Sequence, residues 1–391
     1  MMTSSASTSS TSIPICFIIC FILRGFMPPP PPNIPERSRC TGKRMTNRTT
    51  CRSTKGTGLG HGVVHPARAR TGGMDVVIGA GPLGGAVVRE LRARGRLVRA
   101  VNREGIGELP AEVPVEMADL RDIDVATRVL RDAHTVYLCP TVAATDGPAA
   151  LVTLVEGVIE GSAAAGAVVA YADTLAAYGP STNPYREDMQ PAAVGGWSGA
   201  RADAAETLLA AHAAGRIGGV VVRTSDLFGP GVRDSPFGER VFGRLLSGRC
   251  ALVLGDPDVA HAVTYVEDAA RALVTVAELP AALGQVWHAP SPSAVTPREF
   301  VELAAAAAEV DPRLRESSKL KTLLLAPFSR RYRQLREFWY TYDDSYLVDD
   351  RKYTSTFGEV ATPLEDAIEL TVAWFRDGGQ PATLARPRPV G

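Results

Sequence analysis

The sequence predicts an α/β fold in which a parallel, doubly wound sheet forms the larger part of the body and a smaller C-terminal lobe completes it. Short apolar runs of strand length alternate with longer helix-like segments, an order typical of parallel sheets with right-handed crossovers. The strand-length runs show no polar alternation, which indicates strands buried on both faces. The expected strands are residues 76–78, 97–101, 113–117, 135–138, 167–171 and 220–222. The expected helices between them are residues 82–94, 123–132, 149–165 and 200–214.

The alternation of strands and helices loosens after Arg223, and a turn rich in glycine and proline follows at Gly229-Pro230-Gly231. Residues 285–289 are predicted as one more strand that returns to the sheet, and an aromatic-rich stretch lies at residues 332–353. We therefore expect a sheet domain at residues 74–225 and mostly the smaller lobe at residues 226–391. The helices expected in this lobe are residues 238–246, 266–278, 298–309 and 364–375.

Residues 1–73 differ in kind from the rest of the chain. Ser/Thr repeats come first, followed by an apolar run at residues 13–23 and a proline tract at residues 28–32. The apolar run is shorter than the roughly 20 residues that span a bilayer, and no Lys or Arg precedes it to supply the positive charge of a secretion signal. This composition favours a disordered N-terminal extension with a polyproline spacer. We expect the working protein to begin near Met74, where the first strand starts.

Bulk composition argues against several classes of partner. Hydrophobic residues make up 45% and charged residues 21% of the chain, and the formal net charge is zero. No overall field would therefore draw the protein to nucleic acid or to an anionic membrane. Only Cys139 and Cys250 lie after residue 73, which fits a reducing, cytoplasmic location and provides neither a disulfide framework nor a zinc site. The histidines also lack metal-ligand spacing, so no metal is expected.

A glycine-rich motif follows the first expected strand and opens the first expected helix. Its six residues are Gly79, Ala80, Gly81, Pro82, Leu83 and Gly84. In this context Gly79 permits a tight turn, Gly81 lets the backbone approach a pyrophosphate, and Gly84 lets the helix lie close to the sheet. The helix N-terminus would then face the phosphates with free N–H groups. A simple glycine turn is the alternative, but the strand–turn–helix context favours a dinucleotide site and a Rossmann-type sheet.

The end of the second expected strand bears on which dinucleotide would bind. An NAD site carries Asp or Glu at this point to accept hydrogen bonds from the ribose hydroxyls, whereas this chain has Asn102 and Arg103. A guanidinium group is always charged and matches the geometry of phosphate. Arg103 therefore suits the 2′-phosphate of NADP. Glu104 comes next and leaves NAD as the alternative.

Further motifs follow the glycine turn along the chain. They are Asp119-Leu120, Tyr171 to Thr174 with Tyr178-Gly179, Arg223 with Gly229-Pro230-Gly231, and Thr264 to Asp268. Their order resembles the extended or atypical short-chain dehydrogenase/reductase family, and in particular its NAD-dependent epimerase/dehydratase-like members. The resemblance covers most of residues 74–376. It implies an NADP- or NAD-dependent protein that acts on a small carbonyl or sugar-type substrate held by the smaller lobe.

The resemblance also assigns roles to particular residues. It implies that Asp119 and Leu120 contact the adenine ring, although Asp119 could instead cap the helix that follows. Thr174 matches the family's catalytic hydroxyl residue, and Trp197 and Arg201 stand where the family has its catalytic Tyr and Lys. An indole N–H cannot exchange a proton near neutral pH, so Trp197 cannot be the general acid or base. Arg201 keeps a cation that could hold ribose hydroxyls or a phosphate of the cofactor.

The sequence leaves two functions open. One is an NAD(P)-dependent oxidoreductase or epimerase/dehydratase with a degenerate catalytic pair, which Thr174 and the full-length C-terminal half favour. The alternative is a non-catalytic NADP(H)-binding redox sensor or regulatory protein, which Trp197 and Arg201 favour. The Ala-rich helices expected at residues 149–165 and 200–214 imply, through the resemblance, a homodimer that packs these helices into a four-helix bundle.

Overall fold

The computed structural model describes residues 73–379, apart from residues 106, 108, 111, 141–145, 183, 194 and 318. All described residues belong to one compact unit, Val63–Gly391. The expected N-terminal extension, residues 1–73, lies outside the described residues except for Gly73.

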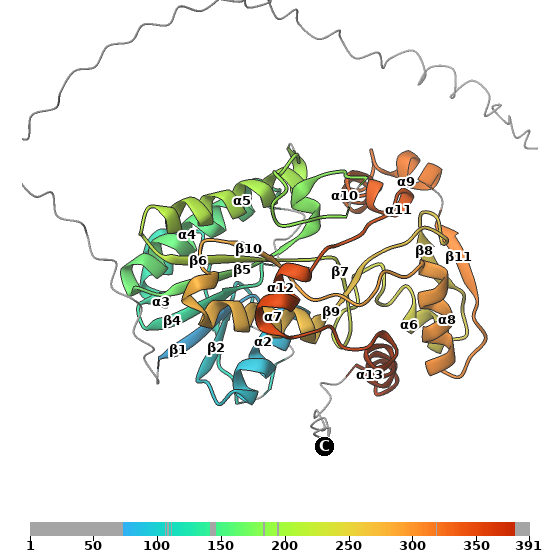
Figure 1. The fold of residues 1–391 in the computed structure, drawn as a ribbon, viewed down its shortest axis with the longest axis horizontal. Coiled ribbons are helices and arrows are strands. Elements are labelled where there is room, and N and C mark those ends of the chain that lie inside the picture. Colours follow the sequence, from blue (N-terminus) through green and yellow to red (C-terminus); the bar gives the residue numbers. More distant parts are fainter. Residues whose placement is uncertain are drawn as a thin grey trace, which may run out of the picture. The chain divides into compact units, whose positions relative to one another are not determined.

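A seven-stranded sheet is the centre of the described chain, and every neighbouring pair in it runs parallel (Figure 1). The strand order is β10-β6-β5-β4-β1-β2-β3. The predicted Rossmann-type, doubly wound sheet is therefore confirmed. The strands are β1 (Met74–Ile78), β2 (Val98–Asn102), β3 (Val115–Met117), β4 (Ala133–Leu138), β5 (Val168–Thr174), β6 (Gly218–Thr224) and β10 (Val286–His288).

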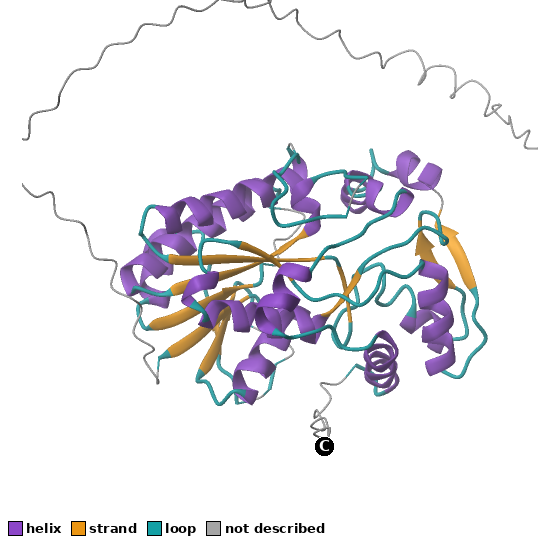
Figure 2. Cartoon of the chain, in the orientation of Figure 1, coloured by secondary structure: helices purple, strands orange, loops and turns teal. Residues whose placement is uncertain are grey.

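Helices cover both faces of this sheet, as doubly wound crossovers require (Figure 2). One face carries α2 (Pro82–Ala93) and α7 (Val266–Glu278), and the other carries α3 (Ile123–Leu130), α4 (Ala149–Ala165) and α5 (Gly196–Ala213). Successive side chains of a strand point to opposite faces, so Val76 packs under α3 to α5 while Val77 packs under α2 and α7. Burial on both faces explains why the strands lack polar alternation.

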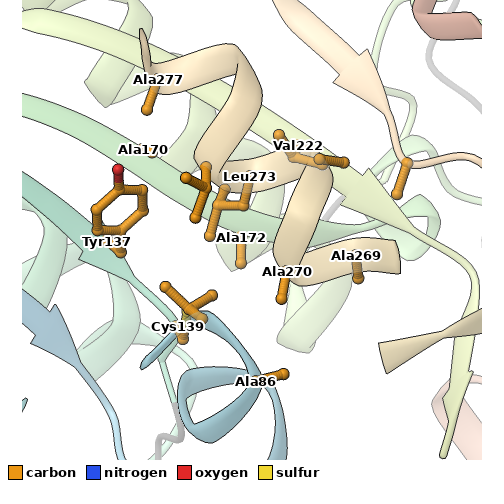
Figure 3. Packing of buried hydrophobic residues seen from close by; sticks show 14 of the residues in the cluster. Ala86, Tyr137, Cys139, Ala170, Ala172, Val222, Ala269, Ala270, Leu273 and Ala277 are labelled. Atoms are coloured by element: carbon orange, nitrogen blue, oxygen red, sulfur yellow. The ribbon is translucent and has the colours of Figure 1, made fainter. Parts of the chain in front are cut away.

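Small side chains bring α7 close to the sheet (Figure 3). Alanines of α7 lie over apolar side chains of β4, β5 and β6, and Leu273 fills the space between them. Close packing of this kind maximises dispersion contacts and leaves little room for larger residues. The residues that meet there are Ala269, Ala270, Leu273 and Ala277 from the helix, and Tyr137, Ala170, Ala172 and Val222 from the sheet.

Two expected helices begin four residues away from the start that the apolar pattern predicts. Helix α5 starts at Gly196 rather than at residue 200, and Glu337 Oε1 accepts a hydrogen bond from Ser198 N at 2.8 Å. A distant carboxylate thus satisfies an open N–H of the first turn, which no local motif reveals. Helix α6 covers only Phe242–Leu246 of the expected 238–246, because Glu239 N donates to Arg233 O at 2.9 Å and forms a turn there.

The smaller lobe follows β6. It contains two short parallel ladders and a core of aromatic and aliphatic side chains around Phe300. The ladders are β7 (Asp226–Phe228) with β9 (Val263–Tyr265) and β8 (Ala251–Leu254) with β11 (Leu314–Ser317). The remaining helices are α8 (Pro297–Ala307), α9 (Lys319–Leu325), α10 (Arg330–Glu337), α11 (Tyr340–Asp343), α12 (Arg351–Phe357) and α13 (Leu364–Arg376), with short 3₁₀ turns at Leu175–Tyr178 and Pro280–Ala282. Within the described part of the chain, no helix has the length and apolar character needed to cross a bilayer.

Candidate functional site

The strand order reverses at β1, which has β2 on one side and β4 on the other. In doubly wound sheets the helices that follow such neighbouring strands leave to opposite faces, and a crevice opens outside the carboxyl ends of the strands. The glycine motif predicted from the sequence follows β1 directly, so it lies at this crevice.

Steric contacts explain two of the glycines in the turn. Gly79 has φ +98°, and a Cβ there would lie 2.1 Å from the carbonyl oxygen of Cys139. A Cβ on Gly84 would lie 1.8 Å from the carbonyl oxygen of Gly79. Pro82 occupies the first position of α2, which has no side-chain cap and no acidic residue in its first turn. The positive end of the helix therefore stays available to an anion. Leu83 turns away and packs against the core under α2 and α7.

A cavity of about 300 Å³ lies on the β2 and β3 side of the glycine turn. The predicted residues at the ends of these two strands all line it, together with Gly79 and Gly81. The structure thus brings together cofactor positions that were predicted from separate motifs. The lining residues from the strand ends are Asn102, Arg103, Glu104, Asp119, Leu120 and Arg121.

Charged groups at this first cavity pair with one another. Arg103 Nη1 lies 2.5 Å from Asp146 Oδ2, and Arg121 Nη1 lies 3.5 Å from the same oxygen. Arg121 also binds both carboxylate oxygens of Asp119, which lowers the pKa of that carboxyl. The cap of α3 is Asp122, which accepts from Asp124 N at 2.9 Å. The alternative that Asp119 caps this helix is therefore wrong.

A second cavity of about 610 Å³ lies on the β5 and β6 side of the same turn, and Thr174 and Arg201 both line it. Ala80 and Gly81 line both cavities, so the two cavities meet at the glycine turn. Trp197 is also a described residue, but it does not line this cavity. Its side chain is half-buried in the first turn of α5. Two of the three predicted catalytic positions therefore share a cavity, and the third lies outside it.

Buried charges hold Arg201 in place. Asp173 Oδ2 accepts a hydrogen bond from Arg223 Nε at 2.9 Å, and both side chains are almost fully buried. The other carboxylate oxygen, Oδ1, lies 3.6 Å from Arg201 Nη1. Asp173 and Arg223 are register partners in β5 and β6, a relation that spacing along the sequence does not reveal. Sequence reasoning therefore missed this ion pair.

The network continues through Tyr178 to a buried histidine. The guanidinium of Arg223 lies 4.2 Å from the centroid of the Tyr178 ring. His288 Nδ1 lies 2.9 Å from the carbonyl oxygen of Asp349 and donates to it, so its Nε2 accepts from the Tyr178 hydroxyl at 2.9 Å. Burial lowers the pKa of His288 to about 4, and the ring is neutral at physiological pH. No cluster of acidic, histidine or cysteine side chains among the described residues could hold a metal ion.

Comparison with known proteins supports this arrangement. The model of the NAD dependent epimerase/dehydratase family matches residues 76–288. No curated protein matches the chain.

Solved structures share the architecture. The UDP-glucose 4-epimerase of Thermus thermophilus, in complex with NAD, is 20% identical over 78% of this chain and 99% of its own, with a TM-score of 0.63. The UDP-glucose 4-epimerase of Thermotoga maritima, with UDP-glucose, is 19% identical over 78% of this chain and 99% of its own, with a TM-score of 0.65. A dTDP-glucose 4,6-dehydratase of Streptomyces venezuelae, with NAD, gives 17% identity, 78% and 97% coverage and a TM-score of 0.64. At such identities the similarity demonstrates the fold alone.

The buried ion pair leads to a stability prediction. We expect Asp173→Asn to lower the free energy of unfolding by about 3–5 kcal/mol, because Arg223 would stay buried without a charged partner. As a control, Asp188→Asn removes a carboxylate whose pair with Arg186 is exposed, and the loss should be below about 1 kcal/mol. Urea denaturation of both variants measures the difference. Similar losses in the two variants would contradict this role for Asp173.

Proposed function

The chain belongs to the NAD-dependent epimerase/dehydratase family, and from this premise we propose that it binds a nicotinamide dinucleotide across its glycine turn and uses it to oxidise or reduce a small carbonyl or sugar-type substrate. The observation that carries the proposal is the pair of cavities that meet at Ala80 and Gly81. A dinucleotide has two nucleoside halves joined by a pyrophosphate, and this arrangement offers one cavity to each half with a helix N-terminus between them.

The first cavity would take the adenosine half, and its charges favour NADP. Arg103 and Arg121 are both placed to bind a 2′-phosphate, a dianion that would compete with Asp146 for them. Glu104 also lines this cavity and leaves NAD as the alternative. The solved structures from Thermus and Streptomyces hold NAD, so the preference for NADP would be a property of this chain.

The second cavity would take the nicotinamide half and the substrate. When bound, the cofactor supplies a hydride or accepts one. Thr174 is placed to hydrogen-bond the substrate oxygen, and Arg201, held by Asp173, is placed to bind ribose hydroxyls or a phosphate. The indole of Trp197 has no proton to exchange near neutral pH, so the family's usual proton transfer is absent.

Loss of that proton transfer favours a second candidate function. A protein that binds NADP(H) without catalysis would sense the redox state or present a surface to a partner. Trp197 and Arg201 at the family's Tyr and Lys positions support this candidate. The two candidates differ in one observable, which is whether bound NADPH is consumed when a carbonyl substrate is added.

Cofactor preference tests the role of Arg103. We expect tighter binding of NADPH than of NADH, and loss of most of that preference in Arg103→Ala. The reason is that a charge-assisted hydrogen bond from Arg103 to the 2′-phosphate would contribute roughly 1.5–3 kcal/mol to binding. Asp146→Asn should strengthen the preference, since it releases both arginines. Arg131→Ala, an exposed arginine away from the cavity, is the control. Fluorescence titration gives the dissociation constants, and equal affinities in the unaltered protein would contradict NADP selectivity.

Substrate turnover tests the enzyme proposal itself. We expect NADPH oxidation with at least one member of a panel of aldehydes, ketones and nucleotide sugars, and its loss in Thr174→Ala. The control is Thr153→Ala, whose hydroxyl is exposed on α4. The double change Trp197→Tyr with Arg201→Lys should raise the rate if the pocket fits a family-like substrate. Binding of NADPH without turnover in every protein would favour the sensor, and turnover indifferent to Thr174→Ala would contradict the placement of the site.

We propose a homodimer in which α4 and α5 of two copies form a four-helix bundle, because these neighbouring helices are rich in small residues. Their exposed positions include Glu156, Asp203 and Glu206, and like charges across the interface repel less as salt increases. Light scattering should therefore show more dimer at high salt than at low salt. Monomer at every salt concentration would contradict the proposal.

A further inference from the structure

We infer that Asp226, held by a hydrogen bond to buried His261, is the group that exchanges a proton with the substrate oxygen in the second cavity. The inference rests on the proposed function and names the residue that replaces the missing acid at Trp197. It concerns an aspartate that follows β6 and a histidine that precedes β9, two positions that the sequence motifs did not single out.

The strand register places Asp226 near Thr174. Thr174 and Thr224 are partners at the ends of β5 and β6, and Asp226 opens β7 two residues further on. At roughly 3.3 Å per residue, two residues advance the chain by about 7 Å. Both Asp226 and Thr174 line the second cavity. The carboxylate therefore shares the space in which Thr174 would hold the substrate oxygen.

One end of the carboxylate is anchored and the other is open. Asp226 Oδ2 lies 2.9 Å from His261 Nε2. The His261 side chain is 3% exposed, whereas the Asp226 side chain is 27% exposed. A carboxylate that is fixed by one buried partner and open to a cavity has the geometry of a positioned general acid or base.

Aromatic stacking fixes the imidazole that anchors Asp226. The ring of His261 stacks on Tyr346 and on Tyr342, with centroids 5.0 Å and 5.8 Å away, and Phe237 closes a further side at 5.2 Å. Its backbone N–H donates to Val295 O at 2.8 Å. The aromatic-rich stretch at residues 332–353 thus supplies two of the three rings that hold the histidine.

The other carboxylates at the second cavity are less suited to the role. The Glu267 carboxylate is already engaged by Arg89 in an ion pair. Asp234 is exposed. Among the described acidic residues that line this cavity, Asp226 alone is held by a buried imidazole.

In the direction of reduction, a bound reduced nicotinamide would supply a hydride that forms a C–H bond at the carbonyl carbon, and the C=O π pair would move to oxygen. The oxygen would then take the proton of the Asp226 carboxyl group, whose Oδ2 stays hydrogen-bonded to His261 Nε2. The substrate would become an alcohol, the nicotinamide would be oxidised, and the Asp226 carboxylate would regain a proton from solvent. In the direction of oxidation, the Asp226 carboxylate would accept the hydroxyl proton while the hydride passes to the oxidised nicotinamide. Thr174 donates a hydrogen bond to the same oxygen.

A matched pair of variants tests the inference. Asp226→Asn keeps the shape and a hydrogen bond to His261 but removes proton exchange, so we expect kcat to fall about 10²–10⁴-fold while NADPH affinity is kept. Asp311→Asn makes the same chemical change at an exposed carboxylate that does not line the second cavity, and we expect its kcat to stay within about three-fold of the unaltered protein. NADPH titration confirms that both variants are folded and bind cofactor.

Two variants at His261 test its positioning role. His261→Phe removes the donor to Asp226 and retains an aromatic ring, so we expect kcat to fall with little change in KM. His261→Gln restores an N–H donor and should recover part of the lost kcat. A purely structural role would instead lower the folded fraction of both variants alike, which circular dichroism measures, and would contradict the positioning role.

The outcomes separate the inference from the proposed function. A large loss of kcat in Asp226→Asn with normal kcat in Asp311→Asn supports the inference. Full activity in Asp226→Asn overturns it and leaves the proposed function intact. If the unaltered protein binds NADPH but turns over no member of the substrate panel, the proposed function fails, and the inference that rests on it fails too.

Discussion

The carbonyl oxygen of Cys139 leaves no room for a side chain on Gly79, and the site is arranged around this contact. Hydrogen bonds join the three strand ends that meet there: Gly79 N donates to Val101 O and Cys139 N donates to Ile78 O, both at 2.9 Å. Strands β1 and β4 are neighbours, and the helices that follow them, α2 and α4, cover opposite faces of the sheet. A crevice therefore opens at the end of β1. The two cavities meet at this point, so the close approach of one backbone segment to another fixes where they lie.

Buried charge is the second organising constraint. Removing Asp173 and Arg223 from water is costly, and their mutual attraction offsets that cost only because the geometry is good and further partners are present. Arg201 and the ring of Tyr178 are those partners. The network therefore connects the stability of β5 and β6 to the orientation of a cation in the second cavity.

The two parts of the site come from different parts of the chain. The glycine turn and the strand ends belong to the sheet and form the proposed cofactor half, where the fold itself supplies N–H groups and a helix dipole. Asp226 and His261 belong to the smaller lobe, and aromatic residues far along the chain fix them. A fold can in this way keep its cofactor half while the chemistry of the other half changes. The proposed match of Trp197 and Arg201 to the family's catalytic positions is consistent with such a change.

Local patterns in the sequence determined the parallel sheet and the glycine turn, together with the residues at the ends of β2 and β3. Apolar runs indicate strands buried on both faces, and the glycine spacing indicates a tight backbone turn. Both patterns depend on residues that are close together in the sequence. Tertiary structure alone decided which distant residues bind one another. Strand register pairs Asp173 with Arg223, and Glu337 accepts a hydrogen bond from the first turn of α5. His261 binds Asp226 beside the paired strands β7 and β9. Each of these contacts joins residues at least 35 positions apart, and no local periodicity encodes a contact at such a separation because only the packed chain brings the two residues together.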